Sequence, residues 1–418
     1  MEINMNIVNL KQYDHKGFFK LYQDTYGDPD HEVKLIRITP TFNSEYAIYY
    51  MKNENVVSIG AVREKKIRIF TEIEKVPMIF GVVTLPEERK KGYAGEVIKS
   101  IIQKLNSNHY DLAIIGPDPK NPKLITYYHK FGFEPFNNRH LVPFYSLFKK
   151  NCNIRKGGLE DVKSINQLFN DYAKIFKIAQ YRDESFTTYR IKETFISGGG
   201  ELFIFSFKNN KNENNNNIGG NEYKDYAYIL IKHGHIIECV NMLQLSNYGF
   251  TEPLEDEDVI VIQNTLKEKG FSELLSIDMV PIASARPVKK EKEEVKYEDV
   301  PFTLIRLLNP ISFIQKYFKY LNWSTFFSTD YKTNFNLNVK VKDDIIGDCA
   351  FNVKRQNGHL TFSTNTDNVN EKEKINFLSV DKEITISELL QKLLHEFLDY
   401  KQNDSFLVND QFYFSENW

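Results

Sequence analysis

The stretch VTLPEERKKGYAGEVIKS, residues 83–100, joins an apolar strand to a helix through three basic residues and a glycine. Both choices are locally unfavourable, because glycine early in a helix costs up to about 1 kcal/mol relative to alanine and cations at a helix start oppose its dipole. A bound anion would account for both, since unpaired N–H groups at a helix start bind phosphate and glycine lets it come close. The stretch therefore predicts a phosphate-binding turn, with a solvated turn of extended basic side chains as the alternative.

The segments around this turn predict a mixed fold of strands and helices. Three short segments and one longer apolar segment before it have the composition of strands, and an amphipathic helix and a buried strand follow it. The expected strands are YAIYYM (46–51), VVSIGAV (56–62), KIRIF (66–70), PMIFGVVTL (77–85) and LAIIG (112–116), and the expected apolar helix face is Val97, Ile98, Ile101, Ile102 and Leu105.

A second helix is expected in NPKLITYYHKFGFEPF, residues 121–136, with Asn121 as N-cap, Pro122 at the first position and Gly132 at the end. This helix and the basic turn together resemble the two motifs of the GNAT N-acetyltransferase superfamily. In those motifs R/Q-x-x-G-x-G/A follows a strand, and N-x-x-[AL]-x-x-x-Y-x-x-x-G-F comes some thirty residues later. The residues in register are Arg89, Gly92, Ala94, Asn121, Leu124, Tyr128, Gly132 and Phe133.

The resemblance implies that the first block binds acetyl-CoA as co-substrate and needs no metal. In GNAT proteins, main-chain groups of the fourth strand hold the pantetheine arm and the turn surrounds the pyrophosphate. The same strand can direct N–H donors at the thioester oxygen. The cofactor-binding residues implied here are Val83, Leu85, Arg89, Lys90, Lys91, Gly92, Tyr93, Ala94 and Asn121.

Tyr128 matches the GNAT tyrosine that protonates the leaving thiolate. A phenol has a pKa near about 10 and a thiol near about 8.5, so this proton transfer is mildly uphill and needs local tuning. The alternative is that Tyr128 is a core aromatic residue with a satisfied hydroxyl. The adjacent Tyr127 leaves open which of the two tyrosines belongs to the core.

Over its whole length the chain is similar to the Eis-type (enhanced intracellular survival) acetyltransferases. Their last domain carries L-x-R-[IL]-x-[ND]-[VP] near its start, and LIRLLNP at 304–310 matches this pattern at Leu304, Arg306, Leu307, Asn309 and Pro310. The implied fold class is α/β (α+β), with two GNAT-like mixed-sheet domains followed by a sterol-carrier-like α+β domain. The expected boundaries are 1–150, 151–298 and 299–418, with a charged linker at 286–301 and an Asn-rich, disordered insertion at 208–225.

The resemblance also implies the base and the acceptor. In the Eis-type family the terminal carboxylate accepts the proton of the amine, and here it would belong to Trp418. An ordinary α-carboxyl has a pKa near about 3.5, so burial must raise it or a water must relay the proton. A frayed end is the alternative. The expected acceptor is a primary amine of the aminoglycoside, polyamine or lysine type, although Asn417 stands where the family often has an acid.

The second block is expected to bind no CoA. Where an active copy would carry a basic glycine turn, residues 252–258 read EPLEDED. Carboxylates repel a pyrophosphate, so this block is expected to act as a scaffold. The histidines of KHGH, residues 232–235, have no third ligand nearby and predict a solvated strand end rather than a metal site.

Composition excludes several classes of function. A net charge of -2 over 418 residues gives no global signal for nucleic acid or an anionic membrane, and the three cysteines are far apart. No signal peptide is evident, and no apolar run approaches the roughly 18 residues of a membrane span. We therefore expect a cytoplasmic protein, and the resemblance to the Eis-type family implies a homo-oligomer, a hexamer. The alternative is an apolar-ligand-binding protein that uses the sterol-carrier-like domain beside a vestigial GNAT domain.

Overall fold

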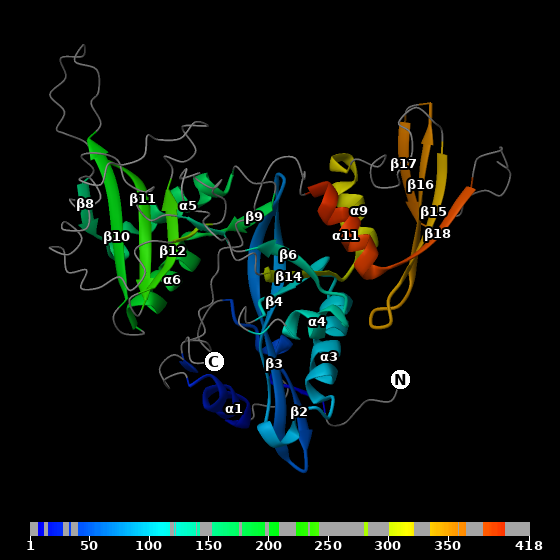
Figure 1. The fold of residues 1–418 in the computed structure, drawn as a ribbon, viewed down its shortest axis with the longest axis horizontal. Helices are drawn as coiled ribbons and strands as arrows, with labels where there is room; N and C mark the ends of the chain where they lie inside the picture. The colour runs from blue at the N-terminus through cyan, green and yellow to red at the C-terminus, as the bar shows by residue number, and fades with distance from the viewer. Residues whose placement is uncertain are drawn as a thin grey trace, which may run out of the picture.

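The computed structural model describes most of the predicted elements. The described residues are 7–11, 16–27, 33–34, 41–117, 121, 123–138, 140–142, 153–174, 178–196, 200–208, 223–232, 235–241, 280–282, 301–321, 335–357, 359–364 and 379–397. Figure 1 shows a central sheet with a second sheet on one side and, on the other, helices and a third sheet. The α/β class with mixed sheets is confirmed.

The central sheet has the strand order β1-β2-β3-β4-β5-β14-β6, with β9 pairing to β3 outside this path. Strands β4 and β5 are parallel, and β14 is antiparallel to both of its neighbours. The bounds are β1 (Ile7–Asn9), β2 (Ile48–Lys52), β3 (Asn55–Ile69), β4 (Glu72–Thr84), β5 (Leu112–Ile115), β6 (Glu134–Asn138), β9 (Ile178–Tyr181) and β14 (Pro301–Leu307).

One strand prediction is wrong: segments 56–62 and 66–70 form a single strand. β3 runs unbroken for 15 residues and pairs with β4 along most of its length. The polar run between the two apolar segments suggested a break. It does not break the strand, because Lys65 and Lys66 pair in register with Val76 and Lys75 across the hairpin.

Helices pack on both faces of the central sheet. The spacing of apolar residues along each helix and the alternation along each strand determine which side chains meet. Helix α3 (Tyr93–Ser107) buries all five residues expected on its apolar face, which confirms that prediction. On β5, Ala113 and Ile115 pack in the cluster of α3, whereas Leu112 and Ile114 pack in a cluster on the opposite face. Helix α1 (Lys16–Tyr26) packs with its own cluster of β3 and β4 residues, and α4 (Lys123–His129) leads into β6.

Strand β14 comes from the third block but lies inside the central sheet. It pairs with β5 through Leu304 and Ile115 and with β6 through Ile305 and Glu134. The segment LIRLLNP therefore completes the sheet that carries the basic turn. Figure 1 shows β14 next to β6 in the central sheet.

The described part of the second block forms an antiparallel sheet in the order β12-β11-β10-β8. Helices α5 and α6 pack with it, and a buried pair of Arg182 with Glu238, 2.8 Å apart, lies in this block. The bounds are β8 (Asn153–Lys156), α5 (Val162–Ala173), α6 (Glu184–Ile196), β10 (Glu201–Lys208), β11 (Tyr223–Lys232) and β12 (His235–Asn241), and a separate two-stranded sheet pairs β7 (His140–Val142) with β13 (Val280–Ile282).

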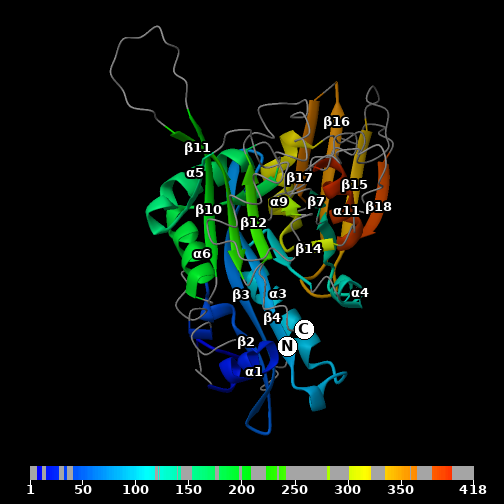
Figure 2. The ribbon, with the colours of Figure 1, turned by 60° about the vertical axis from the view of Figure 1, so that its left-hand side comes forward.

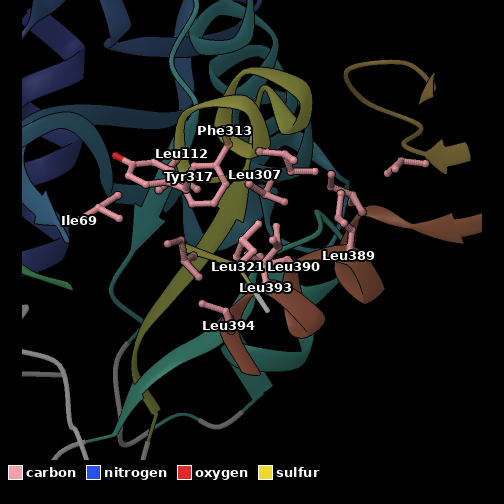
Figure 3. Close-up of a cluster of buried hydrophobic side chains, with 14 of the residues drawn as sticks. Ile69, Leu112, Leu307, Phe313, Tyr317, Leu321, Leu389, Leu390, Leu393 and Leu394 are labelled. Atoms are coloured by element: carbon pink, nitrogen blue, oxygen red, sulfur yellow. The ribbon is translucent and has the colours of Figure 1, made fainter. Parts of the chain in front are cut away.

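The described part of the third block adds a sheet in the order β17-β16-β15-β18, and the helices α9 and α11 lie between this sheet and the central sheet (Figures 1 and 2). Figure 3 shows side chains of these helices, such as Phe313 and Leu390, in one cluster with Ile69 and Leu112 of the central sheet. The bounds are α9 (Pro310–Tyr317), β15 (Phe335–Lys342), β16 (Cys349–Gln356), β17 (His359–Thr364), β18 (Ser379–Thr385) and α11 (Ile386–Phe397).

Several predictions fall outside the described residues or stay open. The linker at 286–300, the acids at 252–258 and most of the insertion at 208–225 lie outside them, although Lys208 and residues 223–225 are in β10 and β11. The three domain boundaries stay predictions. Within the described part of the chain, no helix has both the length and the apolar character needed to cross a bilayer.

Candidate active site

One edge of β4 is open where the strand approaches the basic turn. Parallel pairing with β5 covers only Met78 and Ile79, opposite Ile114 and Ile115. Beyond Ile79 the described residues place no strand against this side of β4, although β4 continues to Thr84. We call residues 80–84 the open edge; at roughly 3.3 Å per residue it is about 17 Å long.

The open edge presents the main chain of Thr84. The N–H of Leu85 donates to the Val57 carbonyl at 2.9 Å, and the Val83 carbonyl accepts from the Ser58 hydroxyl at 2.9 Å. These groups of Leu85 and Val83 therefore face β3. Because the carbonyl and N–H of a trans peptide point in opposite directions, both main-chain groups of Thr84 face the open edge. The alternation of a strand was the signal that could have identified Thr84 from the sequence.

A glycine bend opens this edge. Gly81 has a φ of +61°, and a Cβ placed on it would lie 2.8 Å from the ring of Tyr22. The register between β3 and β4 shifts at the same level, between Ile59 and Ala61. Such a shift bends a strand, and the pairing of β4 with β3 continues beyond it through Val83 and Thr84. The bend accounts for the divergence of β4 from β5 immediately after Ile79.

The basic turn ends in a helix start that has no side-chain cap. Gly92 is the N-cap of α3 in a left-handed conformation, with a φ of +91°, and Lys90 is also left-handed, with a φ of +63°. The N–H groups of Tyr93, Ala94 and Gly95 precede the first intrahelical bond, from Glu96 N to Gly92 O, so they have no acceptor within the helix. This start is a suitable anion site.

The predicted cations gather at this helix start, but two of them have protein partners. Arg89 Nε donates to the Thr84 carbonyl at 3.2 Å, and Lys91 Nζ lies 2.9 Å from Glu88. Lys52 of β2 reaches the same carboxylate at 3.0 Å. Hydrogen bonds from Lys91 and then Lys52 lower the pKa of Glu88.

The sequence predictions missed Lys52 and Glu88. Nothing local in the sequence links Lys52 to the turn, since 36 residues separate it from Glu88. Glu88 was within the quoted stretch, and its position between the strand and the bases was the available signal. Because one carboxylate faces two ammonium groups, the cluster keeps a positive charge beside the start of α3.

Tyr127 and Tyr128 occupy different environments on α4. Tyr128 is buried, 7% exposed, in the cluster that also holds Val97 and Ile98 of α3. Burial, with a smaller effect of Tyr127, raises the pKa of Tyr128 well above its usual value. Burial also raises the pKa of Tyr127, which is half-buried, and its hydroxyl lies 3.7 Å from the position of a Cβ on Gly95.

Both tyrosines therefore stay protonated at working pH. Tyr128 packs in the core with the rings of Tyr127 and Phe133 beside it, so the alternative interpretation as a core aromatic residue also stays open. A raised pKa keeps the proton available but makes its release harder until a thiolate develops nearby. The assignment of the acid to Tyr128 stays a prediction.

The remaining predicted site residues are placed only in part. Asn121 is exposed, and its carbonyl accepts from Leu124 N at 3.0 Å ahead of α4, while Pro122 and Trp418 lie outside the described residues. Gly132 is left-handed as expected for a helix end, with a φ of +73°. Within the described ranges no cluster of His, Cys, Asp and Glu could hold a metal ion.

Comparison with known protein families supports the GNAT resemblance of the first block. Residues 6–136 match a family described as an acetyltransferase (GNAT) domain. No curated protein matches the sequence.

Solved structures resemble the whole chain. One is a probable N-acyltransferase from Enterococcus faecalis, with a TM-score of 0.60 and 11% identity over 95% of this chain and 92% of that one. GCN5-related N-acetyltransferases from Anabaena variabilis (TM-score 0.55, 13% identity, 95% and 92% covered) and Kribbella flavida (0.51, 12%, 87% and 85%) are also similar. At such identities the likeness shows a common fold, and the match to the acetyltransferase (GNAT) domain covers residues 6–136, less than half of the chain.

Proposed function

We propose that the chain transfers an acetyl group from acetyl-CoA to a primary amine. The observation that carries the proposal is the continuity of the open edge of β4 with the uncapped, cation-lined start of α3. A pantetheine arm can extend the ladder along an unpaired strand edge, and a pyrophosphate can accept the N–H groups at a helix start. The GNAT domain match at residues 6–136 supports an acyl-CoA donor.

In this proposal the main-chain N–H of Thr84 donates a hydrogen bond to the pantetheine arm. The N–H groups of residues 93–95 bind the pyrophosphate, with Arg89, Lys90 and Lys91 adding positive charge. Holding thioester and amine together removes much of the entropic barrier to their reaction. Tyr128 donates the proton that the departing thiolate needs, and the carboxylate of Trp418 is the base that the resemblance implies. The acceptor is a small molecule or a peptide carrying a primary amine.

The alternative, a carrier of apolar ligands, is not favoured. The cavity that separates α9 and α11 from the central sheet is lined by eight apolar residues, including Ile67, Ile305 and Leu394. It has room for about one water molecule. A cavity of this size is too small for a sterol or an acyl chain.

A single substitution tests the donor site. Ala94→Glu places a carboxylate in the first turn of α3, where it suits the helix dipole but repels a pyrophosphate. We expect calorimetry to show CoA binding weakened at least about tenfold, or 1.4 kcal/mol, with an unchanged melting temperature. Gln103→Glu adds the same charge on an exposed position farther along the same helix and should leave binding unchanged.

Two outcomes separate the parts of the proposal. CoA binding to Ala94→Glu at wild-type strength would exclude the start of α3 as the donor site. If the wild type binds CoA but releases no thiol from acetyl-CoA with any of a panel of polyamines, aminoglycosides and lysine peptides, the donor site stands and the amine acceptor is wrong.

A further inference from the structure

The segment LIRLLNP contains a charged residue that the strand buries completely. Its leucines and isoleucine pack on the two faces of the central sheet, with Leu304 and Leu308 on the α3 side and Ile305 and Leu307 on the side of α9 and α11. Arg306 alternates with Ile305 and Leu307, so it faces the same side as Leu304, and it is only 1% exposed. A guanidinium at this depth needs partners of its own.

Arg306 connects the third block to the end of α4. One of its terminal nitrogens, Nη1, donates to the carbonyl of Phe131, and the other, Nη2, lies 2.5 Å from Asp343 Oδ2. Asp343 is itself buried, and its second oxygen accepts from the N–H groups of Ile345 and Ile346 at 2.8 and 3.1 Å. A fully bonded carboxylate therefore fixes the position of the guanidinium.

The turn that Arg306 holds is also tied to the backbone of Tyr128. The carbonyl of Tyr128 accepts from Phe131 N at 2.9 Å and from Phe133 N at 3.4 Å. Gly132 between them is left-handed, and a Cβ on it would clash with Arg306 Nη1. Any side chain at residue 132 would displace the guanidinium.

Helix α4 depends on such contacts for its position. It has seven residues, and an isolated helix of that length is unstable in water. Helix α4 ends at His129, and the Phe131 carbonyl two residues later accepts the hydrogen bond from Arg306. A shift of the Phe131 carbonyl therefore also moves Tyr128, which lies three positions earlier in the chain.

We infer that Arg306 is a positioning residue for Tyr128, acting through the Phe131 carbonyl and held in place by Asp343. The inference rests on the proposed role of Tyr128 as the acid. It gives the third block a direct part in the chemistry of the first, because the group that orients the acid comes from residue 306. Misplacing a reacting group by about 1 Å can lower a rate 10²-fold.

A double-mutant cycle tests the inference. Arg306→Lys keeps a cation beside Asp343 but cannot hold both partners with a planar fork. We expect it to lower kcat 10- to 100-fold while KM for acetyl-CoA changes less than about twofold. Tyr128→Phe should lower kcat about 10²-fold, and the double variant should be no slower than Tyr128→Phe alone, because both changes disable one proton transfer.

A matched control separates positioning from stability. Lys316 also joins the third block to the first, but its ion pairs are with Asp111 and Glu74 rather than with the turn after α4. Lys316→Gln should lower the melting temperature and leave kcat unchanged. If Arg306→Lys melts too early to be assayed, Arg306→Met with Asp343→Asn removes both charges together, and the same cycle with Tyr128→Phe is run on that pair.

Each result has a distinct meaning. Losses that multiply in the double variant, or a kcat of Arg306→Lys equal to that of wild type, would overturn the positioning role and leave the acid role standing. A Tyr128→Phe variant with full kcat would overturn the acid role, and the positioning role with it, while CoA binding still tests the proposed donor site.

Discussion

At the scale of single residues, three glycines near the site carry different constraints. Gly81 is left-handed, and a Cβ there would meet the buried ring of Tyr22 at 2.8 Å. Gly92 is left-handed, but a Cβ would have nothing within 4 Å. Gly95 is helical, and a Cβ would make ordinary contacts, the nearest at 3.4 Å to Phe131.

Alanine at these positions should therefore give three different changes in the free energy of unfolding. Gly92→Ala should cost about 1–2 kcal/mol for the left-handed conformation. Gly81→Ala should cost about 2–4 kcal/mol, because overpacking against Tyr22 adds to the same strain. Gly95→Ala should stabilise by about 0.5–1 kcal/mol, since alanine favours the helix.

Urea unfolding of the three variants checks this order. A Gly81→Ala variant no less stable than Gly92→Ala would show that Tyr22 moves aside easily. The Gly95→Ala variant also tests whether the ligand needs the space at this glycine. If Gly95→Ala is more stable but binds CoA more weakly, the ligand needs the space above the helix start.

At the scale of elements, local patterns predicted the helices well and strand pairing poorly. The five apolar residues of α3 and the left-handed Gly132 after α4 follow from spacing and glycine chemistry alone. The placement of β14 between β5 and β6 does not, because its partners lie more than 160 residues away in sequence. The sequence of an apolar strand does not indicate with which strands it pairs.

The candidate site shows the same limit. Its basic turn was evident from residues 89–92, whereas Lys52 comes from a distant strand and the open edge depends on where β4 and β5 part. The polar run inside β3 was misleading for a related reason. Its residues find partners across a hairpin, and composition does not record that pairing.

An ion pair joins β9 and α6 of the second block to β3. Lys66 Nζ lies 2.7 Å from Asp183 Oδ2, beside the register of β3 with β9. Partial burial pushes the pKa of Asp183 upward, but the hydrogen bonds it accepts, first that of Lys66, outweigh it and lower the pKa from 3.8 to about 2. The folded state therefore favours the ionised carboxylate.

This pKa shift predicts the pH range over which ionised Asp183 stabilises the folded state. The stabilisation is complete above the unfolded pKa near about 4 and is lost as the pH falls toward 2. After allowance for solvent screening of a partly exposed pair we expect it to be about 1 kcal/mol. Asp183→Asn should flatten the fall in unfolding free energy between pH 4 and pH 2, and Lys66→Met should reduce it. An unchanged slope in both variants would assign the window to other carboxylates.

At the scale of the whole molecule, the first and third blocks share one core. A single cluster holds Ile69 and Leu112 of the central sheet with Phe313 of α9 and Leu390 of α11, as Figure 3 shows. Each fully buried side chain of this kind contributes roughly 1.5–3 kcal/mol. The strand β14 adds main-chain pairing on both of its sides. A central sheet without the third block would expose both the cluster and two strand edges.

Cutting the chain between these blocks should therefore not separate them. A protease site introduced between Arg286 and Pro301, cleaved after folding, should leave two fragments that run together in gel filtration and melt together. Ile305→Asp, which puts a charge into the shared cluster, should let the cleaved fragments come apart, because an unpaired buried carboxylate is costly. Leu360→Asp, at an exposed position of β17, is the matched control and should leave them associated.

Fragments that separate without any substitution would mean that β14 contributes little to holding the sheet. The turn, the open edge and α4 would then function without the third block, and the path from Arg306 to Tyr128 would lose its structural basis.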